Sequence, residues 1–171
     1  MAEDLLQSLK ADEQLGPGQK EEVTLAPLIE ESIAMYQNSI DEKELKVDVD
    51  VPDDLTIQVH KGQFSQVITN LLSNAVKFSY QGGTNRFKAK RDGHAVHLWI
   101  EDAGTGISNV DQKELFKRFS SYQKKGTKGE ASTGVGLFIC KRILEQHHGD
   151  IEAHSEGEDK GTTFHITLLR N

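Results

Sequence analysis

The chain has 171 residues, 36% of them hydrophobic and 27% charged, which is enough to bury the core of a single domain. The formal net charge of -7 and the sequence pI near 5.5 argue against a general nucleic-acid-binding surface or an acidic-membrane surface. One cysteine excludes an internal disulfide framework, and neither a signal-like N-terminus nor a long apolar run is seen, so we expect a cytoplasmic domain without direct membrane contact.

Residues 1–18 are predicted to be the remnant of an upstream element followed by a linker. A helix-prone stretch with a leucine stripe covers residues 1–13, and the sequence LGPG at 15–18 breaks that pattern. We therefore assign the domain itself to residues 19–171.

A helix and two strands are predicted next. Pro27 suits a first helical turn, and an apolar pattern at helical spacing continues to about residue 40. The alternating runs at 45–51 and 55–60 favour strands on either side of a turn that contains Pro52. The simplest arrangement of these strands is a hairpin or a neighbouring pair.

The helix predicted at 61–78 has an apolar face and a polar face. Asn70, Asn74 and Lys77 fall in one row of the polar face, because residues three and four apart are neighbours on a helix. Such a stripe is usually a solvated surface, but two asparagines lower the helix propensity without adding charge. An asparagine carbonyl oxygen suits Mg²⁺, and a lysine one turn further on can meet phosphate charge. The row therefore indicates a metal and phosphate site.

Strands predicted at 84–91 and 94–102 flank an Asp-Gly hairpin turn. The second strand leads into Asp102 and the glycine turn that follows it. An isolated aspartate before such a turn usually caps it, but a carboxylate on the inner face can instead accept the exocyclic amine of adenine. Gly104 and Gly106 would then let the backbone approach a ligand closely.

A short helix predicted at 111–118 is followed by a polar, glycine-punctuated segment that we expect to be a mobile lid. Six of the twenty basic residues lie between positions 113 and 128, so the positive field that an anionic ligand needs is concentrated there. Gly134, Val135 and Gly136 open a further helix, whose N-terminal amides favour a phosphate group.

Runs typical of strands at 150–156 and 161–169 close the chain as a predicted hairpin, which should complete the sheet. Cys140 lies inside the preceding helix and is expected to be a small core residue. The histidines show no spacing typical of a metal site, since the adjacent His147 and His148 point in different directions on a helix.

Together, the asparagine row, the DAGTG turn and the STGVG turn resemble the catalytic and ATP-binding domain of a two-component sensor histidine kinase. That family belongs to the GHKL superfamily, with the Bergerat fold, which it shares with gyrase, mismatch-repair and heat-shock chaperone ATPases. The resemblance covers about residues 20–169, and residues 1–15 resemble the end of the second helix of the dimerisation and phosphoacceptor domain. It implies an α/β fold, a two-layer sandwich with a mixed sheet of about five strands, three helices on one face and a mobile ATP lid.

The resemblance also implies roles for particular residues. Asn74 corresponds to the Mg²⁺ ligand, Asp102 to the adenine acceptor, and Asn70 and Lys77 to catalytic members of the same asparagine motif. The expected set for ATP and Mg²⁺ is Asn70, Asn74, Lys77, Asp102, Gly104, Gly106, Ile107, Phe116, Phe119, Gly134, Val135, Gly136 and Leu137.

Position 70 bears on the reaction. By this resemblance, position 70 corresponds to a glutamate that activates water in the superfamily's ATPases. In this chain it is Asn70, whose amide has no basic lone pair at neutral pH. The resemblance therefore favours a kinase that presents the γ-phosphate to a histidine on a dimerisation domain outside this chain, with a response regulator downstream. A non-enzymatic nucleotide sensor is the main alternative, and a water-hydrolysing ATPase is less favoured.

None of the seven histidines is followed by the pattern typical of the family's phosphoacceptor, so this chain is not expected to phosphorylate itself. We expect no nucleic-acid partner, and we expect a monomer because the family dimerises through the upstream helices. Ala103 and Ser132 depart from the family's glycine motifs, which bears on the expected geometry of the lid.

Overall fold

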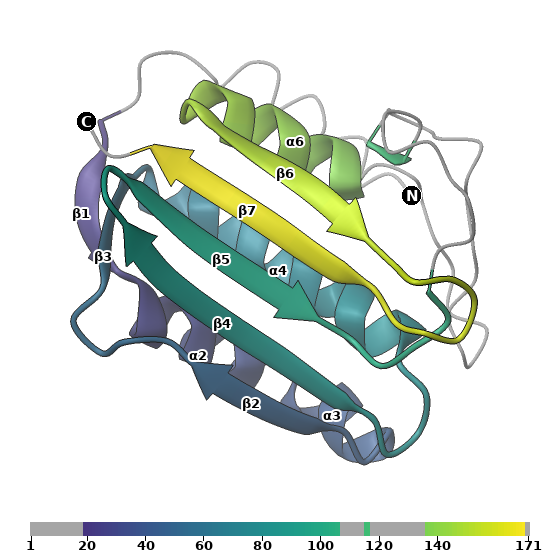
Figure 1. Cartoon of the computed structure of the whole chain (residues 1–171). Helices are drawn as coiled ribbons and strands as arrows, with labels where there is room; N and C mark the ends of the chain where they lie inside the picture. The colour runs from purple at the N-terminus through teal and green to yellow at the C-terminus, as the bar shows by residue number, and fades with distance from the viewer. Residues whose placement is uncertain (1–18, 107–114, 117–135, 170–171) are drawn as a thin grey trace, which may run out of the picture.

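A computed structural model describes residues 19–106, 115–116 and 136–169, and Figure 1 shows how their elements are arranged. The strands are β1 Glu21–Thr24, β2 Lys46–Asp50, β3 Thr56–Val59, β4 Thr84–Asp92, β5 Ala95–Glu101, β6 Gly149–His154 and β7 Thr163–Leu169. The helices are α2 Leu25–Met35, α3 Gln37–Glu42, α4 Lys61–Phe78 and α6 Gly136–Gln146. The predicted upstream remnant and the predicted lid lie outside the described residues.

The described residues form two layers. Five strands make one mixed sheet in the order β2-β4-β5-β7-β6, in which β2 is parallel to β4 and the other pairs are antiparallel. In Figure 1 the helices α2, α4 and α6 lie behind this sheet, and no described helix covers the face turned toward the viewer. The predicted fold class, a two-layer α/β sandwich with a five-stranded mixed sheet and helices on one face, is confirmed.

Most of the predicted elements are also confirmed. The long helix occupies the predicted range Lys61–Phe78. The strands β4 and β5 form a hairpin around Gly93, whose φ of 61° favours glycine. The strands β6 and β7 pair as the predicted closing hairpin.

The core lies between the sheet and its helices. Apolar side chains of α4 and α6 pack against the inner face of the central strands. The deeply buried residues of these helices and strands include Phe64, Val67, Ile68, Leu71, Leu72, Phe87, Leu98, Ile100, Ile139, Cys140, Ile143, Leu144 and Ile166. Cys140 is thus the core residue that the sequence predicts, whereas Phe78 at the end of α4 is only half-buried. This packing sets α4 beside α6.

The predicted pairing of the runs at 45–51 and 55–60 is wrong. The strand β2 joins the edge of the main sheet parallel to β4, and β3 instead pairs antiparallel with β1 in a separate two-stranded sheet. A parallel neighbour needs a long crossover, and the chain between β2 and β4, which includes α4, provides it. The short acidic strand β1 was missed by sequence reasoning.

The helix predicted from Pro27 to about residue 40 is interrupted. The helix α2 already begins at Leu25, with Pro27 in its first turn, and ends at Met35. At Tyr36 the backbone leaves the helical region, with φ -107° and ψ 14°, and its N–H donates to Ile33 O at 3.1 Å in a tighter turn. The chain then continues as the separate short helix α3.

Candidate functional site

The polar row of α4 is half-buried. Asn70, Asn74 and Lys77 all have intermediate exposure, so the row is not a fully solvated helix face. The side chain of Asn74 takes part in none of the hydrogen bonds found among the described residues. The ammonium of Lys77 lies 5.3 Å from the centroid of the Phe78 ring. The row therefore combines an amide oxygen with a nearby cation, as a metal and phosphate site needs.

The side chain of Asn70 faces the interface between α4 and α6. Its Nδ2 is buried, and no nitrogen or oxygen among the described residues accepts a hydrogen bond from it. It lies instead near the Cys140 thiol, whose Sγ donates to Val67 O at 3.8 Å, and burial raises the pKa of Cys140 to about 12. The thiol is therefore protonated and unreactive at neutral pH.

Asp102 follows β5 directly and organises the turn after it. Its Oδ1 accepts hydrogen bonds from Gly104 N at 3.0 Å and from Thr162 N at 3.2 Å. The Asp102 N–H in turn donates to Thr162 O at 2.9 Å. The turn-capping role is therefore confirmed, and recognition of adenine stays a prediction. Because a carboxylate can accept about four hydrogen bonds, the two roles are compatible.

Gly104 joins this turn to the C-terminal end of α4. Its backbone forms a bridge with Ser79, and a Cβ at this position would lie only 1.8 Å from Phe78 O. The next residue, Thr105, donates its N–H to the same oxygen at 3.1 Å. The close approach that requires this glycine is thus to the protein backbone, and it brings the Asp102 turn against the helix that carries the asparagine row.

The loop between β6 and β7 holds the same turn from the other side. Asp159 N donates to Thr105 O at 2.9 Å, and Gly161 N donates to Gly104 O at 3.1 Å. A Cβ on Gly106, whose φ is 68°, would lie 2.1 Å from the backbone oxygen of Gly157, so this glycine also serves a contact within the protein. These loop residues were missed by sequence reasoning, although the glycines before β7 signalled a special turn.

Lys43 is a further residue that sequence reasoning missed. It is only 3% exposed, and its Nζ donates to Val76 O at 2.8 Å, to Lys77 O at 2.8 Å and to Ser79 O at 3.3 Å. These are carbonyls at the C-terminal end of α4, where the last turn of a helix lacks intrahelical donors and where a positive charge is favourable. The buried ammonium therefore fixes the end of the helix that carries Asn74 and Lys77.

The remaining predicted site residues fall into two groups. Phe116 is buried, with its ring edge-on to that of Phe164 at a centroid distance of 6.4 Å, and the Lys141 ammonium lies 6.0 Å from its centroid. Gly136 is the first residue of α6, and Leu137 packs against the core. The predictions for Ile107, Phe119, Gly134 and Val135 lie outside the described residues.

Comparisons with known proteins agree with this geometry. The family described as histidine kinase-, DNA gyrase B-, and HSP90-like ATPase matches residues 59–171. The signal transduction histidine-protein kinase BaeS of Escherichia coli (strain K12) is 31% identical over 174 residues, covering 100% of this chain and 37% of BaeS. Sensor protein SrrB of Staphylococcus aureus (strain NCTC 8325 / PS 47) is 33% identical over 149 residues, covering 87% of this chain and 25% of SrrB. The catalytic domain of histidine kinase ThkA superposes with a TM-score of 0.77 at 21% identity, covering 90% of this chain and 97% of that domain.

The chain therefore belongs to the family of histidine kinase-, DNA gyrase B- and HSP90-like ATPases. Its relatives within that family are sensor histidine kinases, and it corresponds to their ATP-binding catalytic domain. It spans 37% of the length of BaeS and 25% of that of SrrB. Among the described helices, none is both long and apolar enough to cross a membrane.

Proposed function

We propose that this domain binds ATP with Mg²⁺ and presents the γ-phosphate to a histidine on a dimerisation domain outside this chain, with a response regulator receiving the signal downstream. The observation that supports this proposal is the junction of Gly104 with Ser79. It holds the Asp102 turn, which would recognise the base, at the end of the helix whose polar row would meet the phosphates. The turn that would bind the base and the helix that would bind the phosphates would thus be held together by one rigid backbone contact.

Each residue of this site has a proposed role that suits its chemistry. The carbonyl oxygen of Asn74 would hold Mg²⁺, and its half-buried side chain without a described hydrogen bond fits such a ligand. When bound, Mg²⁺ neutralises phosphate charge. Lys77 would add a second positive charge, and Asp102 would accept the adenine amine.

Asn70 favours transfer over hydrolysis. An amide cannot take a proton from water at neutral pH, and the Asn70 amide nitrogen is buried near the Cys140 thiol. Phosphoryl transfer depends mainly on positioning and charge neutralisation, and an acceptor imidazole is itself a nucleophile. A site with these residues therefore suits a kinase whose nucleophile comes from another domain.

The rest of the proposed nucleotide site surrounds this junction. It comprises Gly104, Gly106, Ile107, Phe116, Phe119, Gly134, Val135, Gly136 and Leu137. We further propose that the domain functions in the cytoplasm, that residues 1–18 belong to the upstream dimerisation helix and linker, and that the isolated chain is a monomer.

The reaction can be tested with the dimerisation domain of the parent kinase, mixed with this chain, Mg²⁺ and ATP labelled on the γ-phosphate. The expected product is acid-labile phosphate on the dimerisation domain, with little released inorganic phosphate. ATP binding without any transfer would instead support a nucleotide sensor, and rapid phosphate release would support an ATPase.

Substitution of Asp102 by Asn tests the adenine contact. Asn keeps an oxygen that can accept from Gly104 N and Thr162 N, but it presents an amide to the adenine amine. We expect ATP affinity to fall by about 1.5–3 kcal/mol, measured by calorimetric titration, with the melting temperature little changed. The matched control is Asp92→Asn at the exposed end of β4, and equal affinities for all three proteins would rule out the proposed contact.

A further inference from the structure

The open face of the sheet carries a cluster of metal-ligating side chains. Glu152 and His154 lie two residues apart on β6, so both point to the same side of the strand. His165 on β7 is the direct cross-strand partner of Glu152. One potential ligand atom from each of these residues lies within 4.8 Å of the other two, and the His154 Nε2 to Glu152 Oε2 distance is 3.4 Å.

A fourth residue supports the cluster from the neighbouring strand. Nδ1 of His97 on β5 lies 2.8 Å from Nε2 of His165, within hydrogen-bond distance. Histidines that bind metals usually engage their second ring nitrogen in such a bond, which fixes the tautomer and the ring orientation. With Nε2 of His165 donating to His97, Nδ1 of His165 presents a lone pair.

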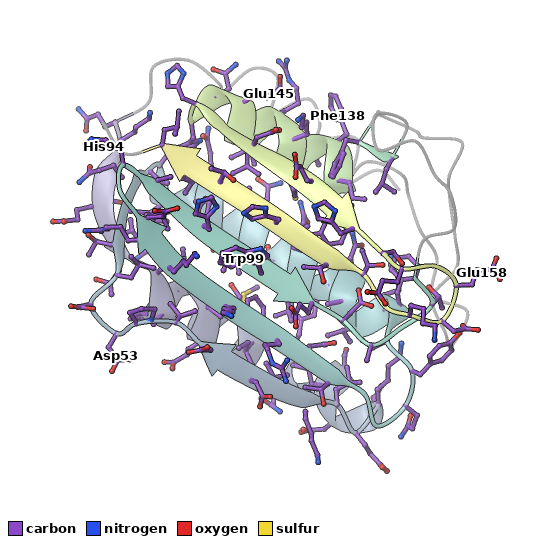
Figure 2. All side chains as sticks on the ribbon, viewed as in Figure 1. Asp53, His94, Trp99, Phe138, Glu145 and Glu158 are labelled. Atoms are coloured by element: carbon purple, nitrogen blue, oxygen red, sulfur yellow. The ribbon has the colours of Figure 1, made fainter. Side chains whose placement is uncertain are left out.

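Stacking holds the same ring in place. The rings of His165 and Trp99 are stacked with centroids 4.8 Å apart, and His97 stacks on both. Figure 2 shows Trp99 on the face of the sheet that no described helix covers. The ring is thus oriented before any ion binds.

We propose that Glu152, His154 and His165 form a binding site for a divalent transition-metal ion such as Zn²⁺, with His97 as the residue that positions His165. Two imidazoles and one carboxylate are a donor set that Zn²⁺ uses with a fourth position open to water. Mg²⁺ prefers oxygen ligands, so this site is distinct in chemistry from the magnesium site proposed on α4. Side chains of the inner face, such as Ile151 and Ile166, separate the cluster from the helices.

The spacing of the histidines along the chain does not indicate this cluster, and the reason is geometric. The two imidazole ligands come from different strands, eleven positions apart, and only the register of β6 with β7 brings them together. Spacing along one helix or one loop is therefore the wrong criterion for this cluster.

The single tryptophan provides a direct assay. Because Trp99 stacks on His165, Cu²⁺ bound at the cluster should quench its fluorescence, and Cu²⁺ binds N/O sites more tightly than Zn²⁺ does. We expect saturable quenching at one Cu²⁺ per nucleotide-free chain, reversed by excess Zn²⁺. His154→Ala and Glu152→Gln should each weaken binding at least about tenfold without unfolding the domain, since both side chains are more than half exposed.

One control and one further variant make the test specific. His94→Ala removes an exposed histidine from the turn after β4 and should leave Cu²⁺ affinity unchanged. His97→Phe keeps a ring in the stack but removes the hydrogen bond to His165, and should weaken binding by about 10–100-fold. Non-saturable quenching, or the same affinity in the parent, His154→Ala and Glu152→Gln proteins, would overturn the proposal.

Discussion

The two ends of α4 are stabilised by different kinds of interaction. At the N-terminal end the His60 ring accepts a long hydrogen bond from Gln63 N at 3.4 Å, and His60 N donates to Nε2 of His147 at 3.0 Å. At the C-terminal end a buried ammonium, that of Lys43, donates to three backbone carbonyls, and the glycine turn at Gly104 packs directly on the helix backbone. One end depends on neutral imidazole rings and the other on a charged cap and close backbone contact.

This difference coincides with the position of the proposed nucleotide site. Asn74 and Lys77 lie in the last two turns of α4, next to the charged cap. A site that positions phosphates needs ligands held by rigid surroundings, and backbone contacts provide that more strictly than side-chain contacts do. We therefore expect substitutions at the C-terminal end of α4 to cost more stability than matched substitutions at its N-terminal end.

The largest effect is expected from Gly104→Ala. The added methyl group would lie 1.8 Å from Phe78 O and 2.9 Å from Ser79 N, so the turn or the helix end must move. We expect the free energy of unfolding to fall by about 4 kcal/mol, measured by urea denaturation.

The control for that substitution is Gly62→Ala in the first turn of α4. A Cβ there would meet nothing closer than the His60 ring at 3.7 Å, and alanine favours a helix by about 1 kcal/mol over glycine. This variant should be as stable as the parent or slightly more stable. Comparable losses for the two variants would remove the distinction between the ends of the helix.

A smaller loss is expected from Lys43→Met. Methionine can fill the space of the lysine stem but donates no hydrogen bond to Val76 O, Lys77 O or Ser79 O. Since a buried acceptor left without a donor costs about 1–3 kcal/mol, and the chain can relax, we expect a loss of about 3 kcal/mol in urea denaturation.

Lys61→Met is the matched control at the other end of the same helix. Lys61 is exposed at the first position of α4, and its removal should change the free energy of unfolding by no more than about 0.5 kcal/mol. If the two methionine variants proved equally stable, Lys43 would not be the cap that its geometry indicates.

Sequence reasoning succeeded where the signal is local. The helix at 61–78 follows from helical spacing of apolar residues, and the β4–β5 hairpin follows from an Asp-Gly turn between alternating runs. The asparagine row and the Asp102 turn are likewise short motifs within single segments. Each of these features could be predicted because the residues that determine it are neighbours in the chain.

Contacts between distant segments could not be predicted in this way. The alternating runs of β2 and β3 reveal that each is a strand but not which strand pairs with it. Lys43 is separated by 33 positions from Val76, the first carbonyl that it caps, and a lysine in a polar loop carries no signal for such a role. Thr162 and the cluster on the open face depend in the same way on which strands and loops become neighbours.

The smallest effect concerns the N-terminal end of α4 and its dependence on pH. Nδ1 of His147 lies 2.8 Å from Ile143 O, so it carries the proton, and Nε2 accepts from His60 N. Burial, which outweighs the hydrogen bond to Ile143, lowers the pKa of His147 below 6.5. A proton on Nε2 would also oppose the His60 N–H. The folded chain therefore holds this ring neutral.

The unfolded chain takes up this proton more readily than the folded chain does. The stabilising contribution of the neutral His147 ring is therefore complete above about pH 6.5, and it is lost as the pH falls from there toward the lower pKa of the folded state.

His147→Gln should lower the free energy of unfolding by about 1 kcal/mol at about pH 7.5, because one buried hydrogen bond is weakened. It should lose less stability than the parent between about pH 7.5 and pH 5.5. His165, whose pKa is also lowered, accounts for part of the remaining decline. His94→Gln is the control: its free energy of unfolding, measured by urea denaturation at both pH values, should fall as much as that of the parent. If the free energy of unfolding of His147→Gln fell by the same amount, this imidazole would not be the cause of the acid sensitivity at this end of the helix.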